Sequence, residues 1–152
     1  MAVLEIGINL GMKNLVEIKY YSSSDKVLDP NIRAKFLNGL ESFINEVYGD
    51  EINVISLSSF EIIIYYEMVQ LSKNKKNRAQ PLLAYAIIER DTNHKFVTKH
   101  LQKIISKFLK KYDINDLISK EPNHFKIFEP KIDKILGDLR FKIEDRIKSI
   151  FR

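Results

Sequence analysis

The sequence predicts a mixed α/β protein of the α+β class, in which an antiparallel sheet packs against amphipathic helices. Residues 82–88, and residues 60–69 apart from Glu61 and Glu67, are apolar at successive positions, which is typical of strands buried on both faces. Residues 2–22 alternate instead between apolar and polar side chains, as expected of a hairpin with one face in water. Other segments repeat apolar residues at intervals of three and four, which is the pattern of amphipathic helices. Because 82–88 is apolar on both sides, we expect it in the middle of the sheet.

The first half of the chain supplies the hairpin, one helix and a short strand. Turn-forming residues at 11–14 separate the two arms of the hairpin. Asp29 and Pro30 are a typical N-cap and first-turn proline, so they predict a helix over 30–48. A short third strand is expected over 52–57, with a tight turn leading into the fourth.

The second half supplies two further helices. Over 92–112 an apolar stripe alternates with a basic arc in which no acidic residue interrupts the lysines. A polar connection over 113–123 follows. Pro130 then begins a long C-terminal amphipathic helix expected over 130–152, whose core positions continue to Ile150.

Size and composition limit the class of protein. The chain has 152 residues and fits a single domain over 1–152 with one core. Cysteine is absent, which excludes disulfides, thiolate zinc sites and a cysteine nucleophile. Neither a signal peptide nor a membrane span fits the sequence, so we expect a cytoplasmic protein, with peripheral membrane association as an addition. The formal charge of +5 favours an anionic partner.

Four stretches together resemble a known family. They are FEIIIYYEMV in the fourth strand, PLLAYAIIE in the fifth, NHKFVTKHLQKIISKFLKKY in the helix that follows, and NHFKIFEPKIDKIL leading into the last helix. In order and apolar spacing they are similar to longin and longin-like domains, including the small sigma chains of clathrin adaptors and the longin-type subunits of the TRAPP tethering complex. The resemblance covers about 2–136. The related roadblock and profilin-like folds usually begin with a helix, whereas this chain begins with a strand.

The resemblance implies a fold and a function. The fold would be a longin-like (profilin-like) five-stranded antiparallel sheet in the order 2-1-5-4-3, with the first helix on one face and the last two on the other. The function would be that of a non-enzymatic interaction module in a trafficking-like or regulatory complex. Its partners would be small GTPases or other longin or roadblock chains, with a homo- or heterodimer as one form of assembly. The basic extension of the last helix to 150 departs from the adaptor chains.

Catalytic and metal-binding motifs are absent from the sequence. His94, His100 and His124 have no paired spacing, so they predict surface histidines and no zinc site, and no cofactor is expected. Glu61 and Glu67 lie in the fourth strand, and Glu61 is expected at its start, in water or against a lysine. A cleft that holds either carboxylate with a histidine would favour an enzyme instead.

Two basic features remain as candidate binding sites. The simplest interpretation is a solvated surface in a lysine-rich protein. The functional one is a docking surface for an acidic protein partner or for an anionic membrane. Nucleic acid is a third alternative, which the scarcity of aromatic residues among the lysines disfavours. The candidate residues come from the turn between the fourth and fifth strands and from the helix over 92–112: Lys73, Lys75, Lys76, Arg78, Lys95, Phe96, Lys99, Lys103 and Lys107.

Overall fold

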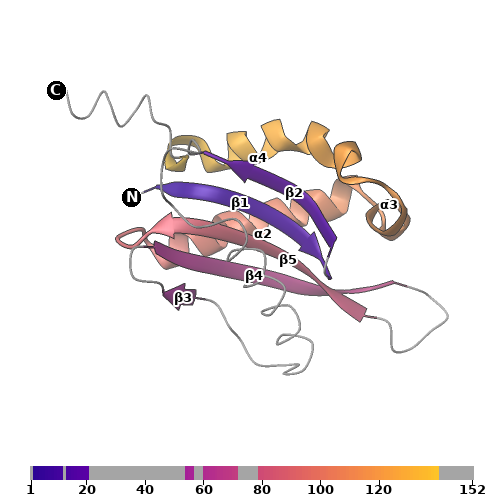
Figure 1. Cartoon of the computed structure of the whole chain (residues 1–152), viewed down its shortest axis with the longest axis horizontal. Helices are drawn as coiled ribbons and strands as arrows, with labels where there is room; N and C mark the ends of the chain where they lie inside the picture. The colour runs from indigo at the N-terminus through magenta and orange to yellow at the C-terminus, as the bar shows by residue number, and fades with distance from the viewer. Residues whose placement is uncertain (1, 12, 21–53, 57–59, 72–78, 141–152) are drawn as a thin grey trace.

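A computed structural model describes residues 2–11, 13–20, 54–56, 60–71 and 79–140. The helix expected over 30–48 lies outside the described residues. The chain is of the α+β class, with an antiparallel sheet on one side and helices packed against it (Figure 1).

The sheet consists of four long strands and one short one, and every pairing between them is antiparallel. The strands are β1 (Val3–Leu10), β2 (Lys13–Lys19), β3 (Val54–Ser56), β4 (Phe60–Gln70) and β5 (Ala79–Glu89). The long strands lie in the order β2-β1-β5-β4, and the three residues of β3 pair with β4. β5 therefore has a neighbour on each side, and its residues 81–88 are buried on both faces, which accounts for its apolar sequence.

The expectation of one wet face for the N-terminal hairpin is wrong for β1. Every residue of β1 is buried, including Glu5 and Asn9, because the strand lies between β2 and β5 and is covered on both faces. β2 has only one long neighbour among the described strands, and its Glu17 and Lys19 remain exposed. The polar positions of β1 thus belong to the interior of the protein.

The helical segments follow β5 and lie on one side of the sheet (Figure 1). They are α2 (His94–Lys111), α3 (Ile114–Ser119), η1 (Pro122–Phe128), α4 (Glu129–Leu136) and η2 (Gly137–Leu139), where η denotes a 3₁₀ helix. The expected polar connection over 113–123 is therefore partly helical, and a reciprocal capping box between Asp113 and Asp116 begins α3. The side chains of α2, η1 and α4 share one apolar core with β1 and β5.

The expectation of one continuous C-terminal helix is wrong within the described residues. α4 ends at Leu136, where Gly137 takes a φ of 56°, a conformation that side chains with a Cβ rarely adopt. One turn of η2 follows, and Arg140 then bridges to Val3 at the beginning of β1. Residues 141–152 lie outside the described part of the chain.

No helix among the described residues is long and apolar enough to cross a membrane.

Candidate functional site: the basic surface of helix α2

Helix α2 begins directly after β5 and is fixed at both ends. The side chain of Asn93 accepts a hydrogen bond from the backbone N–H of Phe96 at 3.0 Å, which caps the first turn. The backbone N–H of Tyr112 bonds to the carbonyl of Phe108 at the other end. Lys110 and Lys111 in the last turn complement the negative end of the helix dipole. α2 is therefore a well-defined platform for its side chains.

The buried stripe of α2 determines which side chains face solvent. Its five buried residues are Val97, Leu101, Ile104, Ile105 and Phe108. The predicted candidates on the opposite side are exposed at Lys95, Phe96, Lys99 and Lys103, while Lys107 is half-buried. The remaining candidates, Lys73, Lys75, Lys76 and Arg78, lie outside the described residues.

The lysines of α2 follow a row that winds slowly around the helix. Each step of four residues turns about 40°, because an α-helix has 3.6 residues per turn. The row therefore begins on the outer side at Lys95 and approaches α4 by Lys107 and Lys111. There the four lysines of this end and of α4 line a depression of about 300 Å³: Lys107, Lys110, Lys111 and Lys131, with Phe128 as the apolar wall. Of these four lysines only Lys107 was among the predicted candidate residues; Lys110, Lys111 and Lys131 were not.

An aromatic cluster holds the two sides of this depression together. The ring of Phe108 lies 5.1 Å from that of Phe128 and 5.6 Å from that of Phe125. Tyr112 adds edge contacts to both, and the ammonium of Lys111 lies 5.8 Å from the centre of the Tyr112 ring. Because these rings are buried, the end of α2 and the start of α4 are packed in a fixed relation.

Phe96 is an exposed aromatic residue within the basic surface. Its side chain is 51% exposed, although its ring has an edge contact with His100 at 4.6 Å between centroids. Nδ1 of His100 donates to the carbonyl of Phe96 at 2.7 Å, which fixes the tautomer because the carbonyl can only accept. The outer side of α2 therefore presents one large apolar group among lysines.

The structure brings Glu61 together with a histidine. Nε2 of His94 lies 2.9 Å from one carboxylate oxygen of Glu61, and the hydroxyl of Ser56 donates to the other at 3.1 Å. Glu61 lies near the start of β4, as expected, but it is only 6% exposed, and its described partner is a histidine where a lysine was expected. His94 was expected to be a solvated surface residue, and it is instead half-buried in this pair.

The chemistry of this pair differs from that of a catalytic triad. The hydrogen bond from His94 holds the pKa of the Glu61 carboxyl below its ordinary value, with a smaller contribution from Ser56 and against the effect of burial. Ser56 donates to the carboxylate and not to the imidazole, so the histidine does not activate it. Both carboxylate oxygens are engaged in contacts that join β3, β4 and α2.

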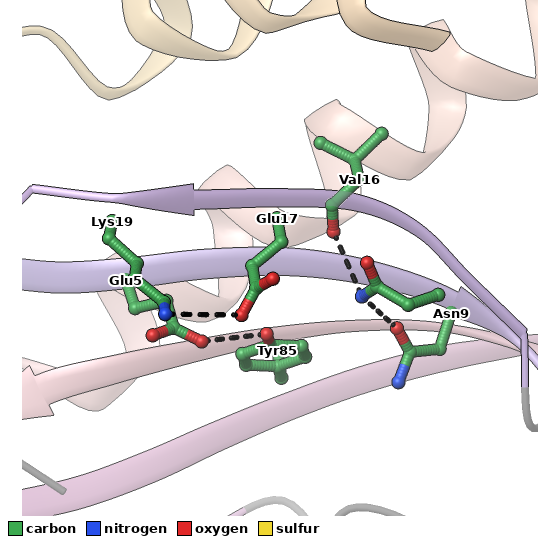
Figure 2. Close-up of polar contacts among 7 residues, drawn as sticks. Glu5, Asn9, Val16, Glu17, Lys19 and Tyr85 are labelled. Atoms are coloured by element: carbon green, nitrogen blue, oxygen red, sulfur yellow. Dashed lines mark hydrogen bonds and ion pairs between the residues drawn. The ribbon is translucent and has the colours of Figure 1, made fainter. Parts of the chain in front are cut away.

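A second buried carboxylate lies on the opposite face of the sheet. The phenol of Tyr85 donates to Oε2 of Glu5 at 2.7 Å, and Figure 2 shows the two side chains approaching each other from neighbouring strands. Gly7 permits this geometry, because a Cβ at position 7 would lie 2.1 Å from the ring of Tyr85. Lys19 and Glu17 of β2 form an ion pair nearby at 3.9 Å (Figure 2). The alternating pattern of β1 gave no signal that Glu5 would be buried.

Metal ligation finds no support in the described ranges, where no three His, Asp or Glu side chains come close enough to hold an ion. Comparison with protein-family models gives no match, and no curated protein matches the chain significantly. The candidate site therefore depends on its geometry and charge.

Proposed function

We propose that the protein is a non-enzymatic interaction module of longin type, which binds an acidic surface of a protein partner through the outer side of α2. We call four exposed residues of this side the α2 outer face: Lys95, Phe96, Lys99 and Lys103. Gln102 and Ser106 are exposed beside them. The resemblance suggests small GTPases, or other longin or roadblock chains, as the partner class. A trafficking-like or regulatory complex in the cytoplasm is the setting that this class implies.

The observation that carries the proposal is the exposed ring of Phe96 within an unbroken row of lysines. Aromatic side chains are enriched at the energetic centres of protein interfaces, and surrounding charges promote encounter with a partner of opposite sign. The lysines do not stabilise the helix itself, since like charges four residues apart weaken it by about 0.2–0.5 kcal/mol per pair. No Asp or Glu occurs in α2 to offset them. A binding role accounts for both features.

The longin assignment rests on strand pairing and on the helices that follow. The antiparallel pairing of β1 with β2 and β5, and of β4 with β5, supports the longin-like order 2-1-5-4-3. The position of α2 immediately after β5 supports it as well. The resemblance implies a helix over 30–48 on the second face, and those residues lie outside the described part of the chain.

The proposal of a non-enzymatic role rests on Glu61. A general base at neutral pH needs a pKa near the working pH and a free oxygen directed at a substrate. The pKa of Glu61 is instead lowered, and its two oxygens bond to His94 and Ser56. This arrangement favours a structural contact between strand and helix.

Binding to an anionic membrane is the alternative function, and the same surface supports it. Each lysine close to an anionic bilayer contributes about 1 kcal/mol, and Phe96 could enter the interface. A flotation assay with vesicles of phosphatidylcholine and phosphatidylserine distinguishes membrane binding from protein binding. We expect the protein to remain unbound. Flotation that is lost when Lys95, Lys99 and Lys103 are changed to Glu would establish the membrane function instead.

The protein-binding proposal is tested by affinity capture from the source cell. We expect the triple Lys→Glu variant at 95, 99 and 103 to lose the partner that the unchanged protein retains. The matched control reverses three exposed lysines outside α2, namely Lys120, Lys126 and Lys134, and should retain the partner. Equal loss in both variants would indicate a general effect of net charge and would contradict the proposed site.

A further inference from the structure

We propose that the depression between the end of α2 and the start of α4 is a binding site for a compact organic polyphosphate, meaning several phosphate esters on one small carbon skeleton. Lys107, Lys110, Lys111 and Lys131 would contact the phosphates, and the buried ring of Phe128 forms the base of the site. We call this depression the lysine pocket. It shares no residue with the α2 outer face and does not depend on the proposed function.

The first argument is the concentration of charge. Four ammonium groups line one cavity, and among the described side chains that line it none is acidic. A concave site lined by charge of one sign strengthens the local potential and attracts counter-ions. The volume of about 300 Å³ lies at the lower end of the range for small-molecule sites. A small multivalent anion fits both the concentrated positive charge and the volume of the cavity.

The second argument is that helix stability does not account for the charges. Lys110 and Lys111 suit the last turn of α2, but Lys107 is half-buried one turn earlier and forms like-charge pairs at i+3 and i+4 with them. Lys131 lies in the first turn of α4, where the helix dipole disfavours a cation. Two of the four lysines are therefore placed where they cost stability, which a bound anion would relieve.

The third argument concerns the kind of anion. Among the described residues the lining contains no arginine, so they do not offer the planar, bidentate recognition of a single phosphate. Lysine ammonium groups act as separate point charges, and those from two helices approach the cavity from different directions. Such an arrangement suits several phosphates distributed around a skeleton. The ring of Phe128, which is 2% exposed and packs against Phe108 and Tyr112, forms the base of the cavity and keeps the two helices apart at a fixed spacing.

The test is titration calorimetry of the whole protein with myo-inositol hexakisphosphate, with inorganic phosphate at equal ionic strength as the comparison. We expect saturable binding of the first and at least ten-fold weaker binding of the second. The double variant Lys107→Gln, Lys131→Gln should lose about ten-fold or more in affinity. The matched control Lys95→Gln, Lys99→Gln removes the same charge from α2 outside the pocket and should change affinity less than two-fold.

A compact polyphosphate could be a lipid headgroup or a free phosphate ester, and binding to vesicles distinguishes the two. Vesicles of phosphatidylcholine with phosphatidylinositol 4,5-bisphosphate are compared with phosphatidylserine vesicles of equal surface charge. Binding to the former alone, lost in the Lys107→Gln, Lys131→Gln variant, assigns the pocket to a lipid headgroup. Binding of the soluble probe without vesicle binding assigns the pocket to a free phosphate ester.

No binding of either probe, or equal loss of affinity in the two double variants, would overturn the proposal. A thermal unfolding scan of each variant without ligand confirms that it is folded.

Discussion

Individual residues decide how tightly the sheet can be packed, and Gly7 is the clearest case. The ring of Tyr85 lies across its backbone, and the phenol reaches Glu5 at 2.7 Å. Tyr85 is only 1% exposed, so the ring has little room to move. The second face of the sheet thus depends on a glycine, an aromatic ring and a carboxylate that fit together.

Gly7→Ala should therefore be among the most destabilising single-methyl additions in this protein. We expect a loss of about 3 kcal/mol in the free energy of unfolding by urea, the upper end for overpacking a core. The control is Gly137→Ala, where no atom lies within 4 Å and only the positive φ is penalised, at about 1–3 kcal/mol. The combination Gly7→Ala, Tyr85→Leu should recover part of the loss. A smaller effect at Gly7 than at Gly137 would contradict this packing.

Glu61 offers a pH-dependent prediction. Its pKa is lowered in the folded state by His94, so its stabilising contribution is fully present above the ordinary value of 4.5. That contribution is lost as the pH falls from 4.5 through the lower folded pKa. Glu61→Gln should consequently reduce the free energy of unfolding at pH 7, and the difference from the unchanged protein should narrow below pH 4.5. Urea unfolding of both proteins at several pH values measures this difference in the free energy of unfolding. A difference independent of pH would show that the charge of Glu61 does not contribute.

At the scale of elements, a single lysine ties the N-terminal hairpin to α3. The ammonium of Lys13 donates to the carbonyls of Leu117, Ile118 and Lys120, at 3.2, 3.3 and 2.6 Å. These groups belong to the end of α3, where carbonyls have no partner within the helix. A cation at this end also interacts favourably with the negative end of the helix dipole. Lys13 thus acts as a cap supplied by a distant strand.

Lys13→Met should remove the hydrogen bonds that hold the C-terminal end of α3, while leaving α2 unchanged. We expect about 1 kcal/mol of lost stability and faster hydrogen exchange at the amides of Leu117 and Lys120. Lys19→Met is the matched control, because Lys19 lies in the same strand and its ion pair with Glu17 is exposed. Unchanged exchange at α3 in the Lys13 variant would rule out the capping role.

Element types were more predictable than element ends. The apolar pattern of 60–69 and 82–88 identified two long strands and the interior position of β5, since burial on both faces leaves a direct mark on sequence. The end of α4 was missed because apolar spacing continues through Leu139 and masks Gly137, the residue that stops the helix. Glycine after a helical pattern was the available signal.

At the scale of the molecule, contacts between distant segments could not be predicted from spacing. The α2 outer face follows from helical periodicity alone, and the structure exposes it as expected. The pairing of Glu61 with His94 depends on the register of β4 against β5, which places Glu61 opposite Ile88 just before the chain turns into α2. The lysine pocket depends in the same way on packing between the end of α2 and α4. The spacing of apolar residues within one segment does not determine the register between two strands or the packing between two helices.

The measurement that tests the central claim most directly is quantitative affinity capture with a Phe96→Ala variant. Phe96 is 51% exposed and contributes little to the core, so its loss should leave stability nearly unchanged. Ile127→Ala is the matched control, because Ile127 is an exposed apolar side chain outside α2, at 69%. We predict that Phe96→Ala lowers retention of the partner about ten-fold, corresponding to about 1.4 kcal/mol, and that Ile127→Ala does not. Equal retention by both variants and the unchanged protein would contradict a docking site on the outer face of α2.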